Sequence, residues 1–192
     1  MKASIIIPAY NAAKTIRKTL QSCINQGEEF IEEIIIVDDH SSDNTLDQAK
    51  SFKKAHETVA IHIQTNPKKG ACSARNHGLS LAKGEAIQWL DADDILGDKK
   101  LRCHIDLLEK SGEHLIACQW RKFSDDIQKS ETPNPKKWLD TPTYFTPHDW
   151  IASNYMMVTH AWLGKRSLFL TAGPWNEELK INQDGEFFTR VI

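Results

Sequence analysis

The chain has 192 residues, a hydrophobic fraction of 40% and a charged fraction of 26%, values typical of one soluble globular domain with a substantial core. Its formal net charge of −2 does not favour nucleic acid as a partner, and its irregularly spaced cysteines favour neither a disulfide framework nor a zinc site. No apolar run approaches the roughly 18 residues of a membrane span, and no signal peptide is recognisable. We therefore expect no transmembrane segment in this chain and a cytoplasmic location.

Four short runs rich in β-branched residues predict strands at 3–7, 33–37, 60–64 and 86–90. The first two are apolar on both faces, as is typical of buried parallel strands. Between the runs, apolar residues recur at helical spacing. The helical patterns begin near Ile16, Thr45, Gly70 and Leu101. This alternation predicts right-handed βαβ units in an α/β, Rossmann-like open sheet, mainly parallel, with helices on both faces.

The pattern changes after residue 122, where prolines and lysines interrupt it from Phe123 to Pro147. We therefore divide the chain into a βαβ half, residues 1–122, and the start of a second half of the same domain, residues 123–192. The helical pattern from Asp184 to Ile192 has no capping signal after it. We expect the chain to be truncated at its C-terminus, before most of this second half.

In an open parallel sheet, ligands bind at the carboxyl ends of the strands. Pro8 to Asn11 follow the first strand, and a plain turn in which Asn11 caps the next helix explains them equally well. Asp38 and Asp39 follow the second strand, and a capped turn does not account for two adjacent carboxylates there. Such a carboxylate can accept hydrogen bonds from a base or a ribose.

Three carboxylates lie within four residues after the fourth strand: Asp91, Asp93 and Asp94. Helix capping could occupy one of them but not all three, and the cluster needs compensating positive charge. Mg²⁺ and Mn²⁺ take oxygen ligands, typically one or two carboxylates together with substrate phosphates. The cluster therefore predicts a divalent metal site.

The third strand is followed by Lys68, Lys69 and Gly70, and the next helix carries Arg75 in its first turns. A glycine that opens a helix offers backbone N–H groups to a phosphate. A solvated basic loop explains the two lysines better, whereas Arg75 is the stronger candidate for an anion contact. Acidic clusters and a cation at one sheet edge together predict a nucleoside diphosphate bound through a metal.

With these motifs the sequence resembles glycosyl transferase family 2, a family with the GT-A fold. The resemblance runs from Ile5 to the last residue, with His40 where the family usually has glycine. It rests on five motifs in order: Ile-Pro-Ala-Tyr-Asn at 7–11, Val-Asp-Asp-His-Ser-Ser-Asp at 37–43, Ala-Arg-Asn at 74–76 with Gly78, Leu-Asp-Ala-Asp-Asp at 90–94, and Gly-Pro-Trp-Asn-Glu-Glu at 173–178.

The resemblance implies roles for residues that bind the sugar donor. Pro8, Ala9 and Tyr10, with Asn11 beside them, would line the base pocket, and Asp39 would bond a pyrimidine ring. Arg75 would lie near the base or the diphosphate, and Asp91 near the ribose. Asp93 is the expected metal ligand. Further candidates are Asp38 and Asp94.

The family's catalytic base is a carboxylate at the start of a late helix, and Asp184 matches that place, with Gln183 where an acidic residue is usual. A helix-capping role for Asp184 is the alternative, and Glu186 is a second candidate base. His160 resembles a family residue near the active site, although a lone histidine is more often structural. Trp162 and Trp175 would either floor the sugar pocket or belong to the core.

The implied reaction moves a sugar, with inversion, from a nucleotide sugar to a hydroxyl of a saccharide or lipid-linked acceptor. The expected donor is a UDP-sugar and the expected cofactor is Mn²⁺ or Mg²⁺. A lipid-linked acceptor would place the full-length protein peripherally at the inner face of the membrane. In this reading residues 1–122 bind the donor and residues 123–192 begin the acceptor-side half.

The alternatives differ in how much of the sequence they explain. A dinucleotide-binding oxidoreductase would need a GxGxxG loop in place of Pro8 to Asn11, and a sugar nucleotidyltransferase would need a glycine-rich loop with arginine there. The remaining rival is a nucleotide-sugar-binding domain without turnover, either degenerate or inactivated by truncation.

Overall fold

The computed structural model describes residues 1–112, 114–124, 127–131 and 158–192. Most of the stretch from Phe123 to Pro147, where prolines and lysines interrupt the pattern, lies outside these residues. The strands are β1 (Ala3–Ala9), β2 (Ile31–Asp38), β3 (Ile61–Thr65), β4 (Ala86–Trp89), β5 (Leu115–Ala117) and β6 (Trp162–Lys165). The helices are α1 (Ile16–Ile24), α2 (Thr45–Ala55), α3 (Ala71–Leu81), α4 (Lys100–Ser111), α7 (Arg166–Ala172) and α8 (Gln183–Val191), with 3-10 turns at Glu28–Phe30, Ile127–Lys129 and Thr159–Ala161.

The strands form one sheet in the order β3-β2-β1-β4-β6-β5. β1 pairs in parallel with β2 and β4, and β2 pairs in parallel with β3. β6 pairs antiparallel with β4 and β5. The predicted parallel βαβ arrangement of β1 to β4 is therefore confirmed, and β6, a strand from much later in the chain, extends the sheet beside β4.

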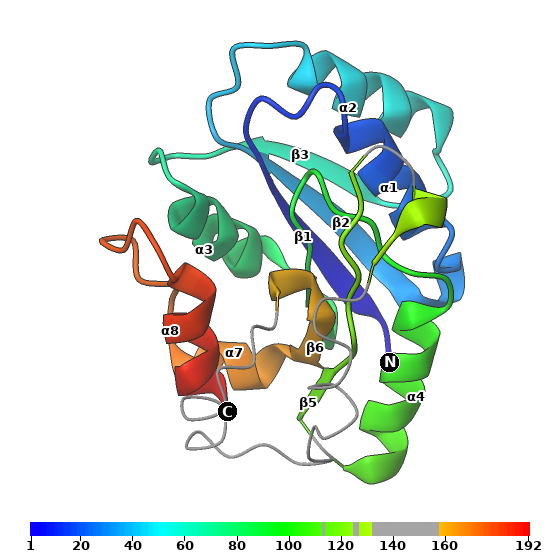
Figure 1. Cartoon of the computed structure of the whole chain (residues 1–192), viewed down its shortest axis with the longest axis vertical. Helices are drawn as coiled ribbons and strands as arrows, with labels where there is room; N and C mark the ends of the chain where they lie inside the picture. Colours follow the sequence, from blue (N-terminus) through cyan, green and yellow to red (C-terminus); the bar gives the residue numbers. More distant parts are fainter. Residues whose placement is uncertain (113, 125–126, 132–157) are drawn as a thin grey trace.

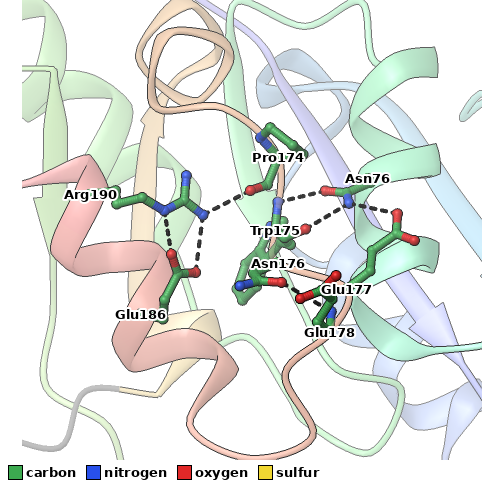
Figure 2. Close-up of a pocket in the computed structure, with 8 residues that line it drawn as sticks. All are labelled: Asn76, Pro174, Trp175, Asn176, Glu177, Glu178, Glu186 and Arg190. Carbon is green, nitrogen blue, oxygen red and sulfur yellow. Dashed lines mark hydrogen bonds and ion pairs between the residues drawn. The ribbon is translucent and has the colours of Figure 1, made fainter.

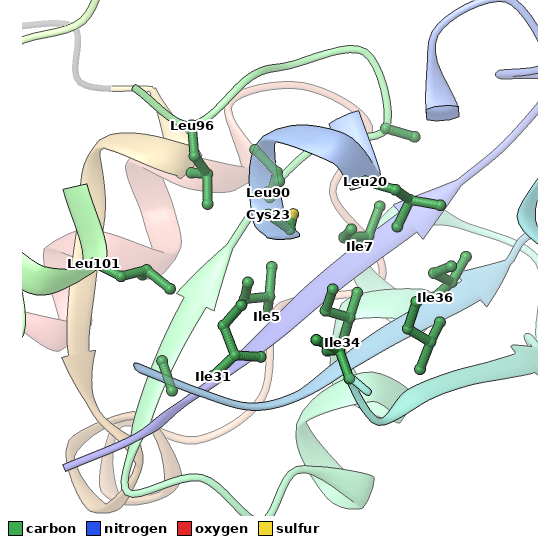
Figure 3. Packing of buried hydrophobic residues seen from close by; sticks show 14 of the residues in the cluster. Ile5, Ile7, Leu20, Cys23, Ile31, Ile34, Ile36, Leu90, Leu96 and Leu101 are labelled. Carbon is green, nitrogen blue, oxygen red and sulfur yellow. The ribbon is translucent and has the colours of Figure 1, made fainter. Parts of the chain in front are cut away.

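The side chains of β1 and β2 alternate between the two faces of the sheet, as the period of two in a strand requires. Ile5 and Ile7 belong to one buried cluster, and Ile6 belongs to the other. The first cluster contains residues of α1, α2 and α4, and part of it is drawn in Figure 3. The second contains residues of α3, α7 and α8. Helices thus cover both faces, as Figure 1 also shows.

The second cluster is unusually aromatic. Trp89 of β4 packs edge-on against Phe169, Trp175 and Phe187, with ring centroids 5.4 to 5.9 Å apart. Edge-to-face pairs of this kind stabilise by more than their buried area alone. Because these rings come from β4, α7, α8 and the segment before α8, they bind the C-terminal residues firmly to the sheet.

The close contact of α3 with β1 depends on Gly78. A Cβ atom at this position would lie 2.4 Å from Cγ2 of Ile6. Only glycine therefore lets the helix approach the strand this closely. Arg75 and Asn76, three and two residues earlier on α3, bond to Asp91 after β4 and to Trp175.

Candidate active site

The carboxyl ends of the parallel strands β1, β2, β3 and β4 meet at one edge of the sheet. The residues that follow these strands therefore lie near one another, although they are far apart in sequence. The structure brings together the polar residues that the sequence singled out at this edge. It also adds partners for them from the C-terminal segment.

The carboxylate of Asp39 is buried and closes the loop after β3. Its Oδ1 accepts from Nδ2 of Asn66 at 2.7 Å and from the backbone N–H of Gly70 at 2.8 Å. The N–H of Asp39 donates to the carbonyl oxygen of Ala9 at 2.7 Å. The Gly70 N–H, expected to meet a phosphate, is thus occupied by Asp39, which ties together the ends of β1, β2 and β3.

Asp38, the last residue of β2, is also buried. Its Oδ2 accepts from the N–H of Ser41 at 3.2 Å, and its Oδ1 has no partner among the described residues. His40 in the same turn has φ 62, a left-handed conformation that glycine adopts more readily. Asp38 therefore offers one buried oxygen that a ligand or water would satisfy.

The turn after β1 differs from the expected helix cap. Helix α1 begins only at Ile16, and Asn11 has φ 48. Its Oδ1 accepts from the N–H of Ser42 at 2.8 Å, so Asn11 joins two strand-end loops and does not cap α1. Tyr10 beside it is 53% exposed, with the ammonium of Lys69 5.3 Å from its ring centroid. An exposed ring at this edge is free to stack on a ligand.

The acidic loop, residues Asp91 to Asp94, has one basic side chain at each end. Nη2 of Arg75 lies 2.8 Å from Oδ1 of Asp91, and Nδ1 of His160 lies 2.8 Å from Oδ2 of Asp94. Within the described part of the chain, neither side chain pairs with the carboxylate of Asp93. Desolvation, followed by the charges of Asp94 and Asp91, raises the pKa of Asp93. A further positive charge beside Asp93 would relieve this repulsion.

The carboxylate oxygens of the acidic loop suit Mg²⁺ or Mn²⁺ held jointly with a phosphate. No three carboxylate, imidazole or thiolate groups converge on one point within the described part of the chain. A site of this type needs only one or two carboxylates, because the nucleotide supplies the other oxygens. The repulsion around Asp93 fits such a cation, and the exposed position of Asp93 leaves its carboxylate accessible to one.

The buried guanidinium of Arg75 contacts the ring of Trp175 and the side chains of Asp91 and Gln183. Its guanidinium carbon lies 4.7 Å from the centroid of the Trp175 ring, and its Nη1 donates to Oε1 of Gln183 at 3.3 Å. Its Nε has no partner among the described residues. The arginine is therefore held in a fixed direction next to the acidic loop, with one donor unused.

Asn76 fixes the position of Trp175. Its Oδ1 accepts from the Trp175 N–H at 2.7 Å, and its Nδ2 donates to the Trp175 carbonyl oxygen at 3.0 Å. Asn76 belongs to the Ala-Arg-Asn motif at 74–76, from which no role for it was predicted. Two bonds to one distant backbone residue leave no periodic signal, so only the structure reveals this clamp.

Asp184 lies in the first turn of α8, where its Oδ1 accepts from the N–H of Gly185 at 3.0 Å. The preceding residue, Gln183, contacts Arg75, which places the start of α8 beside the acidic loop. Glu186 is held by Arg190, with Oε1 and Nε 2.5 Å apart. The carboxylate of Glu186 is thus engaged in an ion pair, whereas no described residue forms one with Asp184, so Asp184 is the better candidate base.

Arg190 also donates to the carbonyl oxygens of Ala172 and Pro174. A hollow of about 400 Å³ lies between α3 and the start of α8. As Figure 2 shows, Asn76, Glu177, Glu186 and Arg190 face one another around it. Trp162 and Trp175 are only 3% and 1% exposed, so both belong to the core. The Trp175 ring contacts the guanidinium of Arg75.

These geometric findings agree with comparisons to known proteins. The sequence model of glycosyl transferase family 2 matches residues 4–171. The chain belongs to glycosyl transferase family 2. It is 40% identical over 104 residues to a poly(ribitol-phosphate) beta-glucosyltransferase of Bacillus spizizenii, covering 53% of this chain and 16% of that protein. It is 42% identical over 106 residues to the UDP-Glc:alpha-D-GlcNAc-diphosphoundecaprenol beta-1,3-glucosyltransferase WfaP of Escherichia coli, covering 55% and 41%.

Solved structures establish the GT-A fold predicted from the resemblance. S. aureus TarS 1-349 in complex with UDP-GlcNAc superposes with a TM-score of 0.80 at 21% identity, over 100% of this chain and 53% of that one. The mannosyltransferase PcManGT of Pyrobaculum calidifontis, in complex with GDP-Man and Mn2+, superposes with a TM-score of 0.76 at 19% identity, over 99% and 51%. This chain thus spans about half the length of these structures.

None of the helices in the described residues is long and apolar enough to cross a bilayer. The four cysteines are free, with Cys23 and Cys72 buried.

Proposed function

We propose that this chain is the donor-binding part of a glycosyltransferase that moves a sugar from a nucleoside-diphosphate sugar, with UDP as the expected nucleotide, to a hydroxyl of a saccharide or lipid-linked acceptor. The observation that carries the proposal is the acidic loop. Arg75 pairs with Asp91 and His160 contacts Asp94 at its two ends, while Asp93 between them is repelled by its neighbours. Mn²⁺ or Mg²⁺ bound to Asp93 and to a diphosphate would complete this arrangement.

The relatives support the donor class. TarS has been solved in complex with UDP and with UDP-GlcNAc, and PcManGT in complex with GDP-Man and Mn2+. The name of WfaP includes UDP-Glc and a diphosphoundecaprenol-linked sugar. A lipid-linked acceptor would bring the full-length protein to the inner face of the membrane, which is part of this proposal.

Residues at the strand ends would bind the nucleoside. Pro8, Ala9 and the exposed Tyr10 would form the base pocket, with Asn11 shaping it through its bond to Ser42. Asp39 has accepting capacity left for a pyrimidine N–H, since a carboxylate can accept about four hydrogen bonds. Asp91 would face the ribose. Asp38 and Asp94 are further candidates, the first through its unpaired oxygen.

The chemistry is a single displacement with inversion at the sugar carbon. When bound, the metal would act as a Lewis acid on the diphosphate. Arg75 would neutralise charge that develops on the leaving nucleoside diphosphate, and Asp184 would accept the proton of the attacking hydroxyl. In this proposal residues 1–122 bind the donor, and residues 123–192 begin the acceptor-side half.

Calorimetry with UDP and Mn²⁺ tests the binding step. We expect saturable binding that requires the metal, together with thermal stabilisation of the protein, because a ligand stabilises the fold by mass action. Asp93→Ala should abolish this response while the apo protein stays folded. If the variant responds to UDP and Mn²⁺ like the parent, the metal assignment is wrong.

A hydrolysis or transfer assay with a panel of UDP-sugars separates the enzyme from its rival, a binding domain without turnover. Turnover that disappears in Asp93→Ala supports the enzyme. Binding of UDP and Mn²⁺ without turnover of any donor supports the rival for this chain.

A further inference from the structure

A buried lysine begins the helix that follows the acidic loop in the sequence. Lys100, the first residue of α4, is 9% exposed, and no carboxylate of a described residue contacts its ammonium group. Taking a cation out of water without a carboxylate partner is unfavourable. A buried lysine at this position therefore indicates a role that an apolar side chain could not perform.

The ammonium of Lys100 determines how the amide of Gln88 is oriented. Nζ donates to Oε1 of Gln88 at 2.6 Å and lies 3.3 Å from Nδ1 of His104. An ammonium group donates only, so the amide must turn its oxygen toward Lys100. The Gln88 NH₂ group then faces the opposite way.

That NH₂ group reaches the residue that contacts the acidic loop. Nε2 of Gln88 donates to the carbonyl oxygen of His160 at 3.0 Å and to that of Trp89 at 2.5 Å. The imidazole of the same His160 lies 2.8 Å from Asp94. Gln88 is completely buried in β4, so the path from Lys100 to the backbone of His160 runs inside the protein.

We infer that Lys100 and Gln88 are positioning residues that hold His160 against Asp94 and thereby set the shape of the acidic loop. The inference rests on the proposed function, because it assigns the loop a metal and a nucleotide. It goes beyond that function in naming two buried residues, neither of them among the expected ligand contacts, on which metal and donor binding depend. Residues that orient the ligands of a metal typically change its affinity 10- to 100-fold when they are replaced.

The decisive variant is Gln88→Glu. Glutamate keeps the shape of the side chain and pairs with Lys100, but both of its oxygens accept, so the His160 carbonyl loses its donor. We expect the protein to stay folded and its affinity for Mn²⁺ in the presence of UDP to fall roughly 10-fold or more. In Gln88→Glu combined with His160→Ala, the loss should be no larger than in His160→Ala alone.

The matched control is Glu33→Gln, the reverse exchange at another buried strand position. Glu33 of β2 accepts from Oγ of Ser4 at 2.8 Å and from the N–H of Lys83 at 2.7 Å, at the amino end of the sheet. The Glu33→Gln variant should have lower thermal stability but an unchanged affinity for Mn²⁺. If Glu33→Gln lost as much affinity for Mn²⁺ as Gln88→Glu, the effect of Gln88→Glu would be due to lower overall stability. That result would overturn the inference.

A measurement without any ligand keeps this test independent of the proposed function. The ring-nitrogen NMR signals of His160 should move in Gln88→Glu toward their positions in Asp94→Ala. If they stay at the parent positions, the inference is wrong, even where UDP and Mn²⁺ bind. If the parent binds neither UDP nor Mn²⁺, the proposed function fails while the NMR result still decides whether Gln88 positions His160. Lys100→Met, which frees the amide to turn over, gives the same test should Gln88→Glu not fold.

Discussion

The guanidinium of Arg75 and the carboxylate of Asp91 form an ion pair of 2.8 Å that joins α3 to the loop after β4. Arg75 also lies over the ring of Trp175, which belongs to the segment before α8. One side chain therefore links three parts of the chain at the proposed donor site. A bound diphosphate would meet a cation that is already aligned and would need little reorganisation.

Arg75→Met tests whether this cation serves the donor. We expect turnover to fall roughly 10²- to 10³-fold, the usual effect of removing one group that stabilises developing charge. Binding of Mn²⁺ without nucleotide should not weaken, because the acidic loop becomes more negative. Steady-state kinetics and metal titration measure the two quantities. Weaker binding of Mn²⁺ alone would indicate that Arg75 merely maintains the shape of the loop.

Asp184→Asn tests the proposed base. The amide keeps the size of the side chain but cannot take a proton, so kcat should fall roughly 10²- to 10⁴-fold, with UDP and Mn²⁺ binding unchanged. Glu186→Gln distinguishes the second candidate, whose carboxylate is held by Arg190. A larger loss of kcat in Glu186→Gln than in Asp184→Asn would transfer the role to Glu186.

Asn76→Asp tests the clamp on Trp175. The carboxylate can still accept from the Trp175 N–H but no longer donates to its carbonyl oxygen, and it adds a charge beside Glu177, which Asn76 contacts at 3.1 Å. We expect the free energy of unfolding to fall by about 1–3 kcal/mol, measured by denaturant titration. Asn176→Ala is the control, because this exposed residue bonds only within its own loop. Equal losses in the two variants would contradict the clamp.

Lys100 predicts how stability depends on pH. Burial lowers the pKa of its ammonium to about 8, against 10.5 for ordinary lysine. Between these values the unfolded chain binds more protons than the folded protein, so the free energy of unfolding should rise with pH there. Relative to Lys100→Met, the parent should gain on the order of 3 kcal/mol between about pH 7 and pH 11. A constant difference across this range would mean that the folded lysine titrates normally.

Local patterns were sufficient to predict the βαβ half. The apolar runs around Ile6 and Ile35 and the helical repeat from Ile16 are short-range signals, and the structure confirms the strands and helices that they indicate. The convergence of Asp39 and Asp91 at one sheet edge followed from the parallel topology alone. Their roles in binding stay predictions.

The partners of these residues could not be predicted, because they lie far away in the sequence. Nothing local shows that Asp94 meets His160, that Asn76 holds Trp175, or that the N–H of Gly70 is used by Asp39. For Asn11, in contrast, the local sequence suggested a partner that the structure does not show. A residue suited to capping the next helix bonds instead to Ser42, because the left-handed turn after β1 directs it there.

The pairing of β6 with β4 has a consequence for how the protein folds. β1, β2, β3 and β4 can associate as they are synthesised, whereas β6 must close a long loop before it reaches the edge of β4. Such non-local closure is entropically slow. Until it occurs, the edge of β4 is open to pairing with other chains. Docking of the strand that follows His160 therefore protects the nascent sheet from aggregation in the same step that brings the imidazole to Asp94.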